Sequence, residues 1–390
     1  MKINKILRVA YGIEDLKEAT ETVILPQAIE RFDSKLAITK AITIDTSDES
    51  KKKGSKVTVD YPIEFGDADN MNDDRSGVDS EIELKQTEIV LDRYIHKQFP
   101  LKETEILGTR SDFILSGAQM AAIDSVARSV EKAIYGEVYK STALFAGDLA
   151  STNPKDRIDV VGARKALKKH GLVEEDRKFL MHEDTEADLM IQMSTNSLSS
   201  DEKLMREGSL GRRFGFDLFS GTYAPEHDAG TAQGNAGLTV NVGVKDAEVI
   251  TISGFNVGET LNDGDILMLA DGTSFSVKGD HTAAAADMAV AVYQVIEADL
   301  QAGVAVTVAD SHNIDLALHS SAATVAFRKL ESVSGDNQFA VNMTHPATGI
   351  PLTLRYWTEH GGRVSKWAVE CLFGIKAFND LGRCVRVGGH

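Results

Sequence analysis

The spacing of apolar positions changes along this chain, and the longest regular stretch is helical. Within residues 109–144, apolar side chains recur at steps of three and four, at Met120, Ile123, Ala127, Val130, Ile134 and Val138. This spacing places them on one face of an α-helix. Some 30 residues without proline predict a rod of roughly 45 Å. The flanking sequence is mostly strand-like, so we interpret the rod as a helix crossed by a sheet and not as part of a helical bundle.

A period of two near the end of the chain predicts a half-buried strand. In SKWAVECLFGIKAF, one face carries Trp367, Val369, Cys371, Phe373 and Ile375. RCVRVGG continues the pattern. These distant strands are therefore expected to pack against the long helix.

Residues 41–104 are rich in strand-forming patterns. AITID and KVTVDYPIEF precede a polar segment, and EIELKQTEIVLDRYIHKQF follows it. The pattern predicts an extended β-hairpin, which has too little core to stand alone and needs a neighbouring surface. Before it, residues 1–40 predict an arm of one or two short helices interrupted at Pro26.

The middle of the chain mixes helices and strands. DRIDVVGARKALKKHG predicts a helix ending at Gly171, RKFLMH a strand followed by another helix, and GRRFGFDLFSGTYAP a strand. There is no repeating order of strand, helix and strand, so the predicted class is α+β and not doubly wound.

Residues 236–322 consist of short alternating runs separated by glycines, with a helix expected over 283–300. This predicts a β-rich domain inserted into a host domain, with its two ends close together. The predicted division of the chain is an arm (1–40), an extended loop (41–104), a peripheral domain (105–146 and 366–390), an axial domain (147–235 and 323–365) and the insertion (236–322).

Composition narrows the class of protein. The chain has 390 residues, 42% of them hydrophobic, enough for a large core. The longest uncharged apolar run, 288–296, is too short to span a bilayer, and the N-terminus lacks a secretory signal pattern. Cys371 and Cys384 are spaced unlike a zinc site or a disulfide framework, which favours a reducing cytoplasm and no membrane.

The net charge of −17 argues against a duplex-binding surface. Affinity for DNA depends mostly on lysine and arginine, which displace counterions. Residues 236–322 hold two basic residues against twelve acidic ones. Such a protein can enclose nucleic acid without gripping it.

No catalytic motif is present, so we predict no enzymatic activity, no metal and no cofactor. His182 begins a dense titratable triplet that is typical of a polar turn. His227 lies near Ser220 and Thr222 without a recognisable oxyanion device. The acidic tip with Asp67, Asp69, Asp73 and Asp74 departs from a calcium loop at Met71, Asn72 and Val78.

Acidic residues cluster on one side of the first predicted helix, at Glu14, Asp15, Glu18 and Glu21. Two interpretations stay open for this cluster. It is either an ordinary solvated helix face or a docking strip for a basic partner.

With this anatomy, the sequence resembles the coat proteins of short-tailed double-stranded DNA bacteriophages, in the branch of the Hong Kong 97-type capsid fold with an inserted immunoglobulin-like domain. The resemblance covers most of the chain in order. It rests on the acidic arm, the extended loop and four segments, SVARSVEKAIYGEVYKS, GSLGRRFGFDLFSGTYAPEHDAGTA, GETLNDGDILMLADGTSFSV and CLFGIKAFNDLGRCVRVGG.

The resemblance implies a shell subunit that forms pentamers and hexamers around double-stranded DNA, without sequence-specific binding. It implies a scaffolding protein and a portal as partners, and a virion capsid assembled in the host cytoplasm. Applied to this sequence, it implies that Glu14, Asp15 and Glu18 meet a basic scaffolding helix. By the same resemblance, Lys51, Lys52, Lys53 and Lys56 contact acidic groups on a neighbouring subunit.

Three other functions remain open from the sequence. A nanocompartment shell of the same fold would enclose an enzyme cargo. A virion surface protein or tail-fibre adhesin is suggested by the insertion alone. A hydrolase using His182 or His227 is the third alternative.

Overall fold

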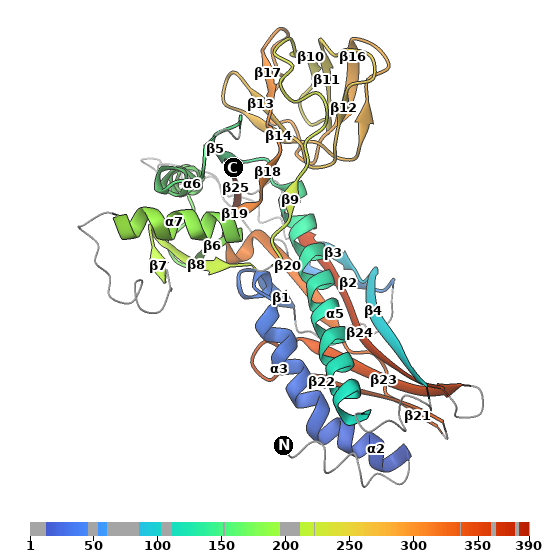
Figure 1. Cartoon of the computed structure of the whole chain (residues 1–390). Coiled ribbons are helices and arrows are strands. Elements are labelled where there is room, and N and C mark those ends of the chain that lie inside the picture. Colours follow the sequence, from blue (N-terminus) through green and yellow to red (C-terminus); the bar gives the residue numbers. More distant parts are fainter. Residues whose placement is uncertain are drawn as a thin grey trace, which may run out of the picture.

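A computed structural model describes residues 13–45, 54–60, 86–102, 111–150, 153–195, 211–221, 223–335, 337–359, 364–378 and 382–389. The described elements form three stacked parts of an elongated molecule (Figure 1). The lower part holds the long helix and a seven-stranded sheet. The middle part has a six-stranded sheet with two helices, and the upper part has short strands. This arrangement confirms the predicted α+β class.

The long helix is α5, Ser111–Ser141. Its predicted apolar face is confirmed, because Ile123, Ala127, Val130, Ile134 and Val138 are at most 1% exposed. These side chains belong to a core that the helix shares with strands from the far end of the chain.

The lower sheet is arranged around β24, Val364–Ala377. β24 pairs with β4 over ten residues, with β23 over seven and with β20 over six. The predicted face is confirmed, since Trp367, Val369, Cys371 and Phe373 are buried in the core that includes α5. The strand is not half-buried as predicted, because Leu372 on the opposite face is also buried, against the hairpin. The other strands of this sheet are β1 (Thr43–Asp45), β4 (Arg93–Lys102), β20 (Ala323–Arg328), β21 (Val333–Gly335), β22 (Gln338–Thr344) and β23 (Pro351–Glu359).

The predicted boundary between the axial and peripheral domains, at 365 and 366, divides strands that belong to one sheet. β20, β22 and β23 lie in the lower sheet with β24, although 323–365 was assigned to the axial domain. β25, Cys384–Gly388, belongs to the middle sheet instead. The assignments of these strands are corrected here. The reason is physical: sheet membership depends on hydrogen-bonded partners, which need not be neighbours in sequence.

The extended loop is also shorter than residues 41–104. β1 pairs with β20 and β4 pairs with β24, so both belong to the lower sheet. In the described chain, only β2 (Lys56–Asp60) and β3 (Gln86–Val90) form a hairpin. Its base packs on its own subunit, with Val57, Ile89 and Leu91 buried against Ala326 and Leu372. A Cβ on Gly374 would lie 2.2 Å from the Val90 carbonyl oxygen, so the hairpin base lies directly on β24. Residues 61–85, with the acidic tip, lie outside the described part.

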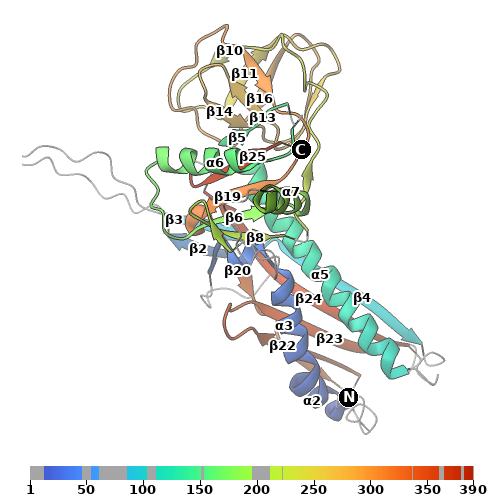
Figure 2. The same cartoon turned by 60° about the vertical axis from the view of Figure 1, so that its left-hand side comes forward.

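The arm runs along α5 as one nearly continuous helical segment. α2 (Ile13–Ala19) passes through a π-helical turn (Thr20–Ile24) into α3 (Leu25–Lys35). The predicted interruption at Pro26 is therefore wrong. A proline fits the first turn of α3 because its missing N–H is not required there. Figure 2 shows α3 beside α5, where Leu25, Ile29 and Phe32 are buried.

A buried carboxylate fixes the end of the arm to α5. Glu131 Oε1 accepts hydrogen bonds from the backbone N–H groups of Ala37 (3.0 Å) and Ile38 (2.9 Å). Burial raises the pKa of Glu131 to about 7, although these two hydrogen bonds act in the opposite direction. The arm is thus attached by specific polar contacts as well as by apolar packing.

The middle sheet has the order β5, β25, β19, β6, β8, β7. Its remaining strands are β5 (Phe145–Gly147), β6 (Arg177–Met181), β7 (Arg212–Arg213), β8 (Phe216–Ser220) and β19 (Asp315–His319). The predicted helices are α6, Arg157–Lys169, and α7, Glu183–Thr195. α6 starts with a capping box between Asp156 and Asp159, and it is followed by Gly171 at a φ of 75°.

The upper part is a β domain with its own core. Its strands are β10 (Thr239–Gly243), β11 (Val249–Ser253), β12 (Thr260–Leu261), β13 (Ile266–Leu269), β14 (Ser274–Ser276), β15 (His281–Thr282), β16 (Asp287–Ala291) and β17 (Val306–Val308). They form two three-stranded sheets and a two-stranded one. β9 (Glu226–His227) and β18 (His312–Asn313) pair at its base, so its two ends are adjacent as predicted.

Two details of the insertion were predicted wrongly. The run DLALHS forms β19 of the middle sheet, so the insertion's core ends at Val308, well before residue 322. The helix expected over 283–300 is replaced by β16 and short irregular segments. Met288, Val290 and Val292 are buried at a period of two, which is the pattern of a strand packed on the domain core.

Candidate functional site

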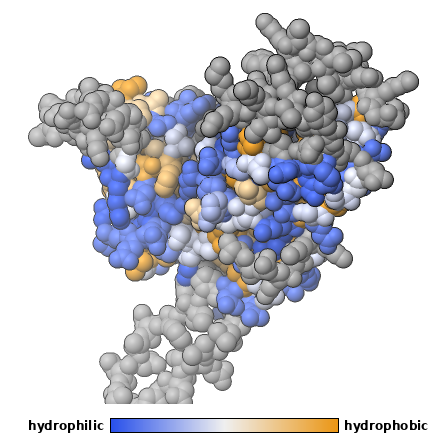
Figure 3. Space-filling model, turned by 90° about the horizontal axis from the view of Figure 1, so that it is seen from below, coloured by the Kyte–Doolittle hydropathy of each residue, from blue (hydrophilic) through white to orange (hydrophobic). Residues whose placement is uncertain are grey.

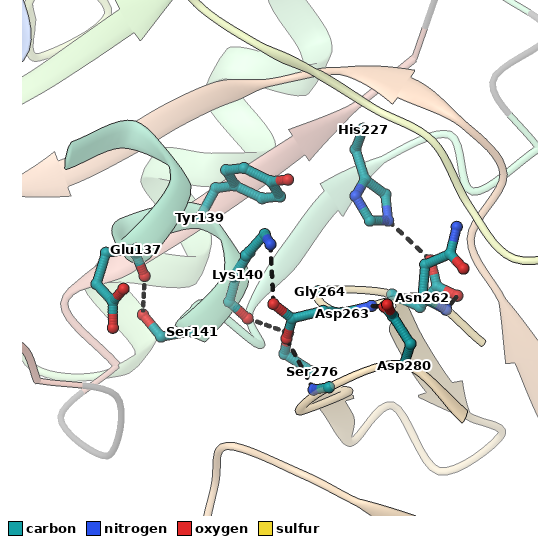
Figure 4. Close-up of polar contacts among 12 residues, drawn as sticks. Glu137, Tyr139, Lys140, Ser141, His227, Asn262, Asp263, Gly264, Ser276 and Asp280 are labelled. Atoms are coloured by element: carbon teal, nitrogen blue, oxygen red, sulfur yellow. Dashed lines mark hydrogen bonds and ion pairs between the residues drawn. The ribbon is translucent and has the colours of Figure 1, made fainter. Parts of the chain in front are cut away.

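The insertion is joined to the host at the C-terminal end of α5. We call this contact the junction, and it consists of Tyr139, Lys140, Ser141, Arg386 and the insertion residues Asp263, Gly264, Ser276 and Gln294. Figure 4 shows the end of α5 with Asp263, Gly264 and Ser276. The last carbonyl groups of a helix have no partner within it. Here Ser276 Oγ donates to the Lys140 carbonyl, and Gln294 Nε2 donates to that of Ser141 at 2.6 Å. The insertion therefore caps the long helix.

Arg386 of β25 bridges the two parts at the junction. Its guanidinium donates to the carbonyl oxygens of Tyr139 and, at 2.8 Å, of Gly264. The side chain is fully buried, and burial lowers the pKa of Arg386 to about 10, so it remains a cation at neutral pH. A cation at a helix C-terminus interacts favourably with the helix dipole. Gly264 has a φ of 97°, a conformation that favours glycine.

A partly exposed ion pair lies beside this bridge. Lys140 Nζ is 2.8 Å from Asp263 Oδ2, as Figure 4 shows. Burial acts to raise the pKa of Asp263. Hydrogen bonds from Lys140, Gly279 and Tyr293 outweigh it, so this pKa lies below its usual value. The carboxylate is thus held ionised while it connects α5 to two segments of the insertion.

His227 lies at the neck of the insertion, where β9 and β18 pair, and among the described residues its Nε2 faces a carboxylate. Its Nε2 lies 2.8 Å from Asp265 Oδ1, and both side chains are buried. Asp265 Oδ2 also accepts from the backbone N–H groups of Gly230 (3.1 Å) and Asn262 (2.7 Å). Burial lowers the pKa of His227, and the hydrogen bond to Asp265 opposes this shift. The arrangement closes a loop of the neck. Thr222, the hydroxyl considered with His227, lies outside the described residues.

A second buried charge cluster, the clasp, consists of Lys155, His182, Thr185, Asn313 and Asp315. Lys155 Nζ is 2.7 Å from Asp315 Oδ2, and both side chains are at most 1% exposed. Asp315 also accepts from the backbone N–H of His182 (2.5 Å) and from Thr185 Oγ1 (2.7 Å). His182 Nδ1 accepts from the Asp184 N–H at 3.3 Å. These contacts connect the starts of α6 and α7 to β19, which is a structural role for His182.

The residues predicted to dock a scaffolding helix lie at the lower end of the molecule. Glu14 and Glu18 are exposed on α2. Asp15 belongs to the same helix, and its side chain is outside the described part. The role of these residues remains a prediction.

The lysines predicted to contact a neighbour are described only at Lys56. This side chain is 62% exposed and forms an ion pair with Glu88 on the adjacent strand of the same hairpin. Lys51, Lys52 and Lys53 lie outside the described residues. The contact of these lysines with a neighbour remains a prediction.

Sequence reasoning missed the buried charges, although one signal was present. Arg386 stands between Val385 and Val387 in a strand with apolar neighbours. A cation in that setting indicates a buried partner, since arginine is rarely buried unless it is paired. The local sequence pattern cannot identify that partner, because Tyr139 lies 247 positions away in the chain.

The described residues include no group of three or more His, Cys, Asp or Glu side chains that could hold a metal ion. No helix of the described chain is long and apolar enough to cross a bilayer. Seen from below, the described surface is largely hydrophilic, with hydrophobic positions in small groups (Figure 3).

No protein-family model matches this sequence, and a search of curated proteins finds no match. Solved structures with a similar course of the backbone include one of Mycobacterium phage Che8. The identity is 11% and the TM-score 0.47, over 86% of this chain and 85% of the other. The capsid of the cyanophage P-SCSP1u has 9% identity and a TM-score of 0.46 over 90% and 86%. The capsid of Ralstonia phage GP4 has 12% identity and a TM-score of 0.45 over 91% of both chains.

Proposed function

We propose that this chain is the major capsid protein of a short-tailed double-stranded DNA bacteriophage, with a Hong Kong 97-type fold and an immunoglobulin-like insertion. One observation carries the proposal: the order of elements along the chain follows the anatomy that the sequence resemblance implies. An arm, a hairpin, a long helix, a mixed domain, an inserted β domain and a long terminal strand succeed one another. The buried charges are used for architecture, which supports a structural role and not an enzymatic one.

The proposed subunit assembles into pentamers and hexamers of an icosahedral shell. The position of α2 supports this, since it lies at the lower end of the elongated molecule, where it can offer surface to neighbours (Figure 1). We assign the contact with a neighbour to the lysines that precede β2 in the sequence, Lys51, Lys52 and Lys53, together with Lys56. Lys56 can exchange partners there, because an exposed ion pair such as Lys56–Glu88 contributes only about 0–1 kcal/mol.

The proposed contents are double-stranded DNA held without sequence-specific contacts. The net charge of −17 supports a container that does not bind its contents tightly. A scaffolding protein and a portal are the proposed partners, without a membrane, metal or cofactor. The proposed location is the virion capsid after assembly in the host cytoplasm.

The proposal is tested by electron microscopy and sedimentation of the purified chain, produced with and without its genomic neighbours. We expect closed hollow particles, with DNA and not an enzyme inside those from infected cells. A monomer or small trimer under every condition would overturn the proposal and favour an adhesin, whereas an enzyme cargo would indicate a nanocompartment. A variant lacking residues 48–54 should fold but give no particles, and unchanged particles would remove the hairpin contact.

The arm makes a separate prediction. Glu14→Lys together with Glu18→Lys should reduce procapsid yield about ten-fold or more when a scaffolding protein is co-expressed. Each lost ion pair contributes only about 0.2–1 kcal/mol, but the loss is repeated in every subunit. The matched control is Glu297→Lys with Glu331→Lys, which reverses two exposed charges outside the arm. Normal procapsids from the arm variant would show that α2 has an ordinary solvated face.

A further inference from the structure

The exposed face of α6 divides into an apolar half and a basic half. Ile158 and Val161 near its start are 71% and 47% exposed. Lys165, Lys168 and Lys169 continue the same face at helical spacing and are also exposed. The residues that line a shallow hollow along this helix are Val161, Arg164, Lys165, Lys168 and Lys169. Lys165 and Lys169 form no ion pair within the described chain, whereas Lys168 is 3.7 Å from Glu174.

The exposed face of α7 carries the opposite pattern. Its first turn is acidic, with Glu183, Asp184 and Glu186, and the helix has no basic residue. Ile191 near its end is 63% exposed. Read from start to end, α6 changes from apolar to basic and α7 from acidic to apolar.

The two helices meet at their apolar halves. Gln192 of α7 accepts from the Arg157 N–H at 3.4 Å and donates to the Lys155 carbonyl at 3.2 Å. Ile158 follows Arg157 in the sequence, and Ile191 precedes Gln192, so both isoleucines lie close to this contact. Figures 1 and 2 show that the helices cross, because α6 is seen end-on in one view and lengthwise in the other. The basic end of α6 and the acidic end of α7 therefore lead away from a shared apolar centre.

We propose that α6 of one copy packs antiparallel on α7 of a second copy of this chain. In this orientation Lys165 and Lys169 face the acidic first turn of α7, while Ile158 and Val161 face Ile191. Charge and apolar surface match at the same time, and the basic helix end meets the acidic helix start, which suits both helix dipoles. Pairing α6 with a parallel α6, or α7 with a parallel α7, would instead oppose like charges, which is unfavourable.

The contact is head-to-tail, since each copy gives α6 to one neighbour and α7 to another. Such contacts close into a ring when the rotation between copies closes. This inference rests on the proposed function, which requires rings of five and six copies. It adds which two helices hold the ring and that charge sets their register. Single pairs are weak, and repetition around the ring makes them effective together.

The test is a charge exchange within the full chain. Lys165→Glu with Lys169→Glu should lower particle yield at least ten-fold, and so should Glu183→Lys with Glu186→Lys. All four substitutions in one chain should restore the yield, because the pairs re-form with reversed sign. The readouts are sedimentation and electron microscopy of particles, with thermal unfolding of the subunit to show that each variant folds.

The matched control for the lysine variant is Lys245→Glu with Lys278→Glu in the insertion, which changes net charge by the same amount and sign and should leave the yield unchanged. Ile158→Asp should also block assembly without unfolding the subunit, since the side chain is largely exposed. Normal yield from either charge variant, failure of the four-fold variant to recover, or an equal loss in the control would each overturn the contact. If the unsubstituted chain forms no particles, the proposed function itself fails, and the two failures are thereby distinguished.

Discussion

Replacing Lys155 with methionine should lower the free energy of unfolding of the unassembled subunit by about 3–5 kcal/mol. The methionine side chain fills most of the same space, so the loss comes from charge. Asp315 would stay fully buried without the ammonium group that lies 2.7 Å from it. Urea denaturation followed by circular dichroism measures this change.

Two further variants separate the charge effect from general damage to the clasp. Adding Asp315→Asn to Lys155→Met should recover most of the loss. Asparagine keeps Oδ1 as an acceptor for the N–H of His182, and its Nδ2 can donate to the hydroxyl oxygen of Thr185, while the buried charge is removed. The matched control is Arg164→Met, which breaks the exposed pair with Glu174 and should cost less than about 1 kcal/mol. A Lys155 variant no less stable than this control would show that the buried pair contributes nothing.

Local periodicity was enough to predict the main elements of the fold. α5 was expected over 109–144 and spans Ser111–Ser141. β24 was expected from alternation that included Trp367 and Phe373, and both are buried. These predictions succeed because each element presents one long apolar face to a core, so the pattern in sequence and the burial in structure have the same cause.

The helix expected over 283–300 shows where propensity misleads. The alanines at 283–286 favour a helix by propensity, whereas Met288, Val290 and Val292 alternate as they would in a strand. In the folded chain these three residues face the core of the insertion from β16 and the segment after it. Tertiary packing decides between the two patterns, since a strand here completes a sheet with β11.

Pairing between distant segments was not predictable from one sequence. β4 and β24 were each expected as strands, but their mutual register, with Phe99 opposite Trp367, joins positions more than 250 residues apart. The boundary errors in the axial domain and the extended loop have this origin. The clasp and the junction were missed for a related reason. A charged residue can be identified as buried only when its partner is known, and here the partners are distant in the sequence.

The second large effect is expected at the junction, for Arg386→Met. The substitution removes the donors to the carbonyl oxygens of Tyr139 and Gly264, which lie in the interior. Leaving two buried acceptors unpaired costs about 1–3 kcal/mol each, so the subunit should lose several kcal/mol of stability. The loss should be concentrated where the insertion meets α5.

Hydrogen exchange locates this loss, and the Arg386 variant should exchange faster at residues 262–265 and at the end of α5. The core of the insertion should keep its protection against hydrogen exchange, because Arg386 is not part of the apolar cluster that forms this core. Arg386→Lys should be intermediate, since an ammonium group retains the charge but lacks the planar fork that reaches two carbonyls. Arg212→Met, at an arginine that is 59% exposed, is the control and should change neither region. If the Arg386 variant exchanges at the same rates as that control, its hydrogen bonds to Tyr139 and Gly264 do not hold the insertion on α5. Apolar contact alone would then hold the upper domain in place.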